Sequence, residues 1–128
     1  MGKKLTDTLT GGIYEYFFVD NGETVYTGST EHVEDKWGAP LEKVDKWHRV
    51  GETFPTKYPY SWTVFRTNLR DTFGERVDIR WKDEPKEMSR EELLTLETKR
   101  IKEAKKIGQS YLNHHNDPLA AWKKYNAS

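Results

Sequence analysis

Two tyrosines and one glutamate are the residues of this chain whose types and positions point to chemistry. Tyr14 closes a Gly-Ile-Tyr triplet at residues 12–14, and Tyr26 opens a Tyr-Thr-Gly triplet at residues 26–28. Glu97 lies among apolar residues in a later segment. A phenol can hold or activate a water molecule, and a carboxylate can bind a hard divalent cation. Together these side chains indicate metal-assisted hydrolysis of a phosphodiester.

The place of Glu97 on its predicted helix is unusual for a carboxylate. With about 100° per residue, several apolar residues lie within about 60° of it: Leu93, Leu94, Ile101 and Ala104. Glu97 therefore projects from the centre of the stripe that should face the core, where an unpaired charge is costly. Two interpretations stay open: a structural ion pair with an arginine, and coordination of a divalent metal ion.

The two triplets belong to segments that are predicted as the arms of a β-hairpin. Residues 12–19 are rich in β-branched and aromatic types, which favour strands. Asn-Gly at residues 21–22 is a strong hairpin signal, so residues 23–28 should return as the second strand. Alternating apolar and charged residues over 75–82 predict a third strand, and an acidic loop over 83–88 should follow it.

The register of this hairpin decides whether the two tyrosines can share a site. A two-residue turn pairs Tyr26 with Phe17 and places Tyr14 on the opposite face from Tyr26. A three-residue turn over residues 21–23 pairs Tyr26 with Phe18 and puts both tyrosines on one face. A shared site therefore requires an odd-length loop or a β-bulge.

Helical periodicity and capping signals complete the predicted fold. Helices are expected at residues 30–37, with Ser29 or Thr30 as the cap, and at 41–49, 60–73 and 89–108, with a last helical turn at 119–125. The chain should thus be an α+β domain. Its small three-stranded antiparallel sheet should be flanked by helices in the order β-β-α-(α)-α-β-α.

These motifs resemble those of the GIY-YIG nuclease superfamily. The triplets at 12–14 and 26–28 are similar to its two half-motifs, and the eleven residues between them fit its spacing. The family's element order is similar too: a hairpin, helices, a third strand, and a helix that carries a metal-binding glutamate. The resemblance covers residues 11–113, which leaves residues 1–10 as a flexible N-terminal tail and residues 114–128 as a C-terminal extension packing on the domain.

The resemblance implies a role for each site residue. Tyr14 would activate or position the attacking water, and Tyr26 would help to hold the phosphate or the water network. Glu97 would bind one Mg²⁺ or Mn²⁺, and such an ion can polarise a phosphoryl oxygen and stabilise the leaving oxygen. Asn113 matches an asparagine that often follows the family's last helix, and His32 lies close enough to Tyr26 in the chain to touch the site.

The chain departs from the family pattern at two positions. Thr27 replaces the usual isoleucine, which is a mild change because both are β-branched. Lys36 stands where the family has an arginine on the first helix; it keeps the positive charge but loses the planar fork that holds phosphate through two bonds. Activity would then be weak, altered in geometry or lost, unless Arg49, Arg66 or Arg80 supplies a guanidinium to the substrate.

Composition fits one soluble domain and limits its partners. The 128 residues are 34% hydrophobic and 33% charged, and this length can bury a core without disulfides. The net charge of zero argues mildly against nucleic acid. Cysteine is absent, which is compatible with a reducing cytoplasmic setting. No segment approaches the ~20 apolar residues of a membrane helix, and the N-terminus has no signal-peptide pattern.

The sequence leaves three functions open. The first is a small metal-dependent endonuclease that cuts DNA with loose specificity, dimerises, or takes its specificity from a partner protein. The second is a catalytically weak or inactive module of the same fold that binds nucleic acid or a protein. The third is a structural interaction domain in which the tyrosines and Glu97 belong to the core.

Overall fold

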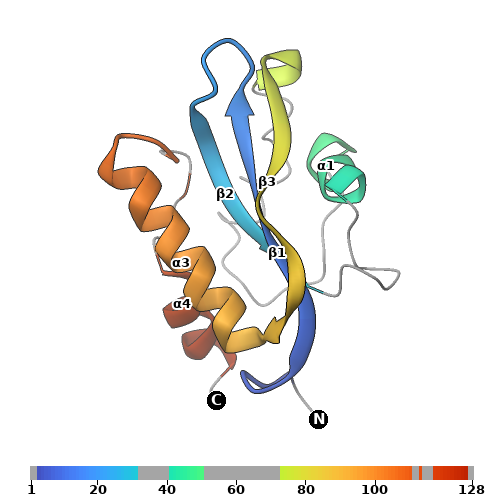
Figure 1. Ribbon diagram of the computed structural model, residues 1–128, viewed down its shortest axis with the longest axis vertical. Coiled ribbons are helices and arrows are strands. Elements are labelled where there is room, and N and C mark those ends of the chain that lie inside the picture. Colours follow the sequence, from blue (N-terminus) through green and yellow to red (C-terminus); the bar gives the residue numbers. More distant parts are fainter. Residues whose placement is uncertain (1–2, 32–40, 51–72, 111–112, 114–116, 127–128) are drawn as a thin grey trace.

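The computed structural model describes residues 3–31, 41–50, 73–110, 113 and 117–126, with only the backbone described for residues 46–50 and 125–126. Three antiparallel strands form an open sheet in the order β2-β1-β3 (Figure 1). The strands are β1 (Thr8–Phe18), β2 (Thr24–Thr30) and β3 (Val77–Ser89). The helices are α1 (Leu41–Val50), α3 (Arg90–Lys106) and α4 (Pro118–Asn126), with a 3-10 turn at Gly74–Arg76. The predicted α+β class and three-stranded antiparallel sheet are confirmed.

The hairpin forms, but its connection and its start differ from the prediction. Strand β1 begins at Thr8, so an N-terminal tail that extends to residue 10 is wrong. Five residues, 19–23, connect β1 to β2, instead of two or three. Gly22 has a φ of 77°, which glycine adopts at no steric cost. The Asn21 side chain accepts a hydrogen bond from the Glu23 backbone N–H at 2.9 Å, so this residue builds the turn through its side chain.

A β-bulge sets the register that a shared site requires. Tyr16 pairs with Tyr26, but the next pair along β1 is Phe17 with Thr24, so Val25 is the extra residue. Tyr14 pairs with Gly28 and therefore lies on the same face as Tyr26. The prediction of a bulge or odd loop that places both tyrosines on one face is confirmed. The expected pairing of Tyr26 with Phe18 is wrong, because the bulge lies inside β2 and shifts the register there.

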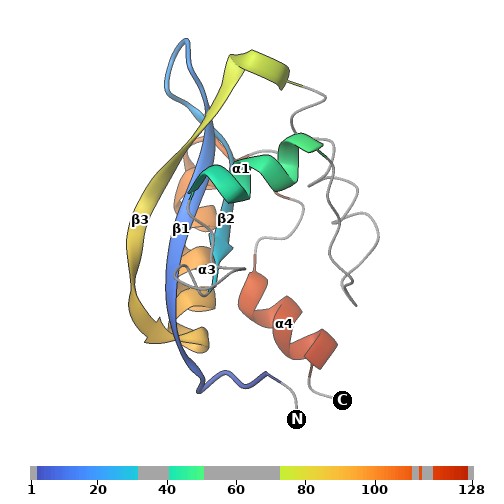
Figure 2. The ribbon, with the colours of Figure 1, turned by 90° about the vertical axis from the view of Figure 1, so that its right-hand side faces the viewer.

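The sheet is packed on both faces. One face carries the buried aromatic residues of β1 and β2, and Val44 of α1 packs against them. The other face carries Leu9, Ile13 and Met88, which pack against Leu93 of α3. Helices α1 and α3 accordingly lie on opposite sides of the sheet (Figures 1 and 2). Any side chain of α3 that reaches the sheet meets the face opposite to the tyrosines.

Strand β3 is longer than predicted. The segment 83–88, expected as an acidic loop, continues the strand to Ser89. The breaker in that segment is Pro85, which lacks a backbone N–H. Proline is tolerated in an edge strand such as β3 where its missing N–H is not needed for pairing, and the β1–β3 pairs pass from Lys86 to Asp83 without Pro85. Pro85 also lies beside the register irregularity between Gly11 and Ile13 of β1, where regular pairing is already interrupted.

The remaining helices follow their local signals. Ser89 and Glu92 form the predicted capping box at the start of α3, and Gly108, with a φ of 80°, follows its end. Helices α1 and α4 match the predictions at 41–49 and 119–125. Residues 29–30 belong to β2. The predicted helices at 30–37 and 60–73 fall almost wholly outside the described residues, and so does the helix start that Ser29 or Thr30 was expected to cap.

Candidate functional site

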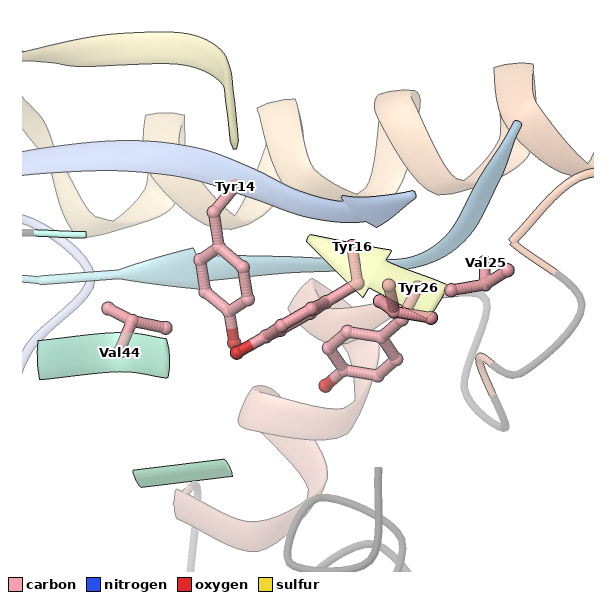
Figure 3. Close-up of a cluster of buried hydrophobic side chains, with 6 residues drawn as sticks. Tyr14, Tyr16, Val25, Tyr26 and Val44 are labelled. Carbon is pink, nitrogen blue, oxygen red and sulfur yellow. The ribbon is translucent and has the colours of Figure 1, made fainter. Parts of the chain in front are cut away.

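Three tyrosines form a buried cluster on the α1 face of the sheet (Figure 3). Tyr14 and Tyr26 come from different strands, and their ring centroids lie 6.4 Å apart. Tyr16 stands between them in sequence, edge-on to Tyr14 at 6.1 Å, and its hydroxyl donates to Asp45 Oδ1 of α1 at 3.2 Å. Tyr14 and Tyr26 are only 3% and 4% exposed. The structure thus brings the two predicted phenols together, and it encloses them.

Gly28 makes room for the phenol of Tyr14. A Cβ atom built at Gly28 would lie 2.5 Å from both Cζ and the hydroxyl oxygen of Tyr14, far inside van der Waals contact. The Tyr14 ring therefore crosses from β1 over the backbone of β2, and its hydroxyl lies against the edge strand. This contact gives the glycine of the second triplet a physical reason, because any larger residue would displace the phenol.

Glu97 lies on the other face of the sheet. It projects from α3 and is 6% exposed, so the prediction that it faces the core is confirmed. The hydroxyl of Ser29 donates to Glu97 Oε1 at 2.6 Å. Ser29 pairs with Ile13 across the strands and shares its face, on which Leu93 packs. The carboxylate and the phenols therefore do not converge on one face; they reach consecutive residues of β2, Ser29 and Gly28, from opposite sides.

Asn113 holds the outer edge of β2. Its side-chain Oδ1 accepts from the Thr27 backbone N–H at 2.9 Å, and its Nδ2 donates to the Thr27 carbonyl at 2.8 Å. The same edge is bonded at Thr24, whose N–H donates to Gln109 Oε1 and whose carbonyl accepts from the Ser110 N–H, both at 2.8 Å. The Asn113 amide thus replaces a neighbouring peptide group, and its role here is to position the strand.

A buried arginine, Arg90, joins three segments beside the site. It is 2% exposed, and its Nε donates to Glu31 Oε2 at 2.7 Å, directly after β2. Its Nη1 donates to Asp7 Oδ2 at 2.8 Å and to the carbonyl of Lys4. Burial lowers the pKa of Arg90, but the hydrogen bonds to Glu31 and Asp7 outweigh it, so the net shift of this pKa is upward. The end of β2 is thereby fixed against the start of α3.

Ser29 and Arg90 are the two site-adjacent residues that sequence reasoning missed. The sequence predicts Ser29 or Thr30 as a helix cap, although strand alternation from Tyr26 places Ser29 on the face opposite to the tyrosines. Arg90 precedes Glu97 by seven residues, two helical turns, and so shares its buried stripe. Strand alternation thus indicates the face of Ser29, and helical spacing indicates the face of Arg90.

The remaining predicted contributors are engaged elsewhere or lie outside the described part of the chain. Arg80 donates to Glu15 Oε1 at 2.6 Å and to the Gly22 carbonyl at 2.9 Å, and Glu15 lies on the face opposite to the tyrosines. His32, Lys36 and Arg66 fall outside the described residues, and the side chain of Arg49 is not described.

The donor set near Glu97 fits a magnesium-type ion only in part. Among the described residues, no group of three or more His, Cys, Asp or Glu side chains could hold a metal ion. Mg²⁺ usually keeps several waters and takes one or two carboxylates together with substrate phosphates. Glu97 can therefore serve as a single protein ligand, with its Oε1 oriented by Ser29, and substrate and water would complete the shell.

Comparison with known proteins gives no indication of function, so function is argued from the residues described above. The chain matches no family model, and no curated protein or solved structure matches it. Within the described residues, none of the helices is long and apolar enough to cross a membrane.

Proposed function

We propose that this protein is a divalent-metal-dependent endonuclease that hydrolyses DNA phosphodiester bonds, in the manner of the GIY-YIG nucleases that its triplets resemble. One observation carries the proposal. Four consecutive residues of the edge strand β2, 26–29, supply the Tyr26 phenol, the glycine beneath the Tyr14 phenol, and the hydroxyl that binds Glu97. This stretch of strand therefore lies between two phenols on one face of the sheet and a buried carboxylate on the other.

The side chains divide the proposed work. Tyr14 positions the attacking water, and since a free phenol has a pKa of about 10, it can act as a base only beside a cation. Tyr26 holds the phosphate or the water network. When bound, Mg²⁺ or Mn²⁺ would polarise a phosphoryl oxygen and stabilise the leaving oxygen. Glu97 would hold that ion, and its burial keeps the carboxylate from turning into solvent.

The cationic side chains belong to substrate binding in this proposal. Lys36 takes the place of the family's arginine at the phosphate, and His32 and Arg66 contribute further contacts to the substrate. Asn113 acts through Thr27, by holding the strand that carries Tyr26 and Gly28. Its contribution is therefore to position the strand.

Cleavage of supercoiled plasmid tests the proposal. The wild-type protein should nick the plasmid with Mg²⁺ or Mn²⁺, and Glu97→Gln should lower the rate by about 100-fold or more, because it removes the metal-binding charge. Glu15→Gln is the matched control, since Glu15 is an equally buried carboxylate, at 6% exposed, whose bonds to Thr24 and Arg80 lie outside the proposed site. Equal cleavage by wild type and Glu97→Gln would rule out the assigned role.

A second candidate is a non-catalytic module that kept the fold and binds nucleic acid or a protein partner. Two observations favour it: both phenols are enclosed, and Glu97 meets the opposite face of the sheet. Lys36 in place of arginine points the same way. Under this function the protein would shift a labelled DNA duplex in a gel without cutting it, and Glu97→Gln would leave that binding unchanged.

A further inference from the structure

We propose that Ser29 is a positioning residue that orients the Glu97 carboxylate for metal binding; this inference rests on the proposed nuclease function. The contact is specific. The Ser29 hydroxyl donates to Glu97 Oε1 at 2.6 Å, which is the range of a charge-assisted bond from a hydroxyl to a carboxylate. The terminal torsion of a glutamate side chain is broad, so a bond to one oxygen restricts the orientation of the carboxylate.

The backbone that carries Ser29 is held on both sides. Two residues earlier, the peptide groups of Thr27 are bonded to the Asn113 amide. Two residues later, Glu31 is bonded to the buried guanidinium of Arg90, which belongs to the first turn of α3. Since α3 also carries Glu97, donor and acceptor are fixed to one framework, and the hydroxyl is aimed before any ion binds.

Burial strengthens this bond. Glu97 is 6% exposed, so little water competes for Oε1, and a hydrogen bond in such surroundings is electrostatically stronger than one in water. Partners that orient a metal-binding side chain typically contribute 10- to 100-fold to metal affinity or activity. Removing the Ser29 hydroxyl should therefore weaken metal binding about tenfold.

A structural hydrogen bond would change stability alone, so the test measures metal binding directly. The free Mn²⁺ signal in electron paramagnetic resonance gives the dissociation constant for the full chain. Ser29→Thr keeps a hydroxyl and Ser29→Val is its isosteric partner without one, and both are β-branched residues suited to a strand. Ser29→Val and Ser29→Ala should bind Mn²⁺ about tenfold more weakly, and Ser29→Thr within about threefold of wild type.

Thr24→Val is the matched control. The Thr24 hydroxyl donates to Glu15 Oε2 at 2.9 Å, which is a buried bond of the same kind from the same strand to a carboxylate outside the proposed site. This variant should lose stability in urea but keep the wild-type Mn²⁺ affinity. Glu97→Gln gives the baseline for lost binding.

The outcomes separate the inference from the function on which it rests. If wild type binds Mn²⁺ and nicks plasmid while Ser29→Val and Ser29→Thr bind Mn²⁺ equally well, Ser29 does not position the carboxylate and the nuclease function stands. If wild type neither binds Mn²⁺ nor cuts DNA, both proposals fail. A loss of affinity in Thr24→Val equal to that in Ser29→Val would also overturn the positioning role, because the effect would then follow stability.

Discussion

A glycine decides where the Tyr14 phenol lies. The ring crosses the backbone of β2 at Gly28, in space that a methyl group would fill. It is held there from the side by Tyr16, edge-on at 6.1 Å, and by Tyr26 at 6.4 Å. Since all three rings are buried and interiors are close-packed, the phenol has little room to move aside. The position of one hydroxyl is thus set by the absence of a side chain on the next strand.

Gly28→Ala should therefore lower the free energy of unfolding by about 1–3 kcal/mol, the usual range for overpacking a well-packed core. Tyr14→Ala removes the ring that the new methyl group would strike. In that background Gly28→Ala should cost less than about 0.5 kcal/mol, which makes the two changes strongly non-additive. Urea denaturation of the four proteins in this cycle measures the coupling. Additive effects would show that the ring does not occupy the space above Gly28.

At the residue scale, the sequence predicts the burial of a side chain when that burial depends on one helix or strand alone. The burial of Glu97 follows from helical periodicity alone, and it is confirmed. The bond from Ser29 to Glu97 joins residues 68 positions apart and depends on how α3 packs on the sheet. The same holds for the partners of Asn113 and Arg90, which come from distant segments. Local patterns give the face of a side chain, whereas its partner comes from tertiary packing.

At the scale of elements, β2 is an edge strand that is not left open. Gln109, Ser110 and Asn113 bond the peptide groups of Thr24 and Thr27 along its outer side. The Thr27 hydroxyl is also bonded to that of Ser110, at 2.7 Å. An open edge invites pairing with another chain, so this cover both protects β2 and fixes the segment that carries Tyr26, Gly28 and Ser29.

Asn113→Ala should destabilise the fold, because it removes part of the cover over the outer edge of β2. The change leaves the N–H and C=O groups of Thr27, a residue only 1% exposed, without their partner. An orphaned buried group costs about 1–3 kcal/mol, so we expect a loss of about 2–4 kcal/mol in urea denaturation. Amide hydrogen exchange at Thr27 should accelerate in the variant.

Asn113→Asp is the conservative comparison for that test. It keeps an oxygen for the Thr27 N–H but sets a second oxygen against the Thr27 carbonyl, so at neutral pH it should also destabilise the fold. If Thr27 exchanges at the wild-type rate in both variants, the amide of Asn113 does not hold the strand.

The elements themselves are predictable to the extent that their signals are local. Helix α3 starts at its capping box and is followed by Gly108, as predicted. The extension of β3 through Pro85 could not be predicted, because the proline is tolerated only where the strand forms an edge. A shared site predicts an odd-length loop or a bulge, because an Asn-Gly turn alone would put the tyrosines on opposite faces. The position of the bulge, at Val25, comes from the structure.

At the scale of the whole molecule, arginines tie α3 to the rest of the fold. Arg90 bonds the first turn of α3 to Asp7 and to Glu31 after β2. Arg100, about three turns later, donates two hydrogen bonds to the carboxylate of Asp83 in β3, of 2.7 Å to Oδ2 and 2.8 Å to Oδ1. Charge thus holds α3 at its first turn and again at Arg100, in its second half, in addition to the apolar stripe that packs on the sheet.

This arrangement makes stability depend on pH through Asp83. Hydrogen bonds from Arg100 lower the pKa of Asp83 below its ordinary value, against a smaller opposing effect of burial. Because the folded pKa is the lower one, the pair's stabilisation is present above the unfolded pKa of about 3.9 and is lost as the pH falls through the folded value. Water screens this partly exposed pair, so we expect the pair to stabilise the fold by about 1 kcal/mol or less.

Asp83→Asn should therefore lower the melting temperature relative to wild type at pH 7, and the difference should shrink below about pH 4, since acid removes the same charge in the wild type. Thermal denaturation of both proteins across that range measures it, and a difference that stays constant from neutral to acid pH would show that the contribution of Asp83 is not electrostatic.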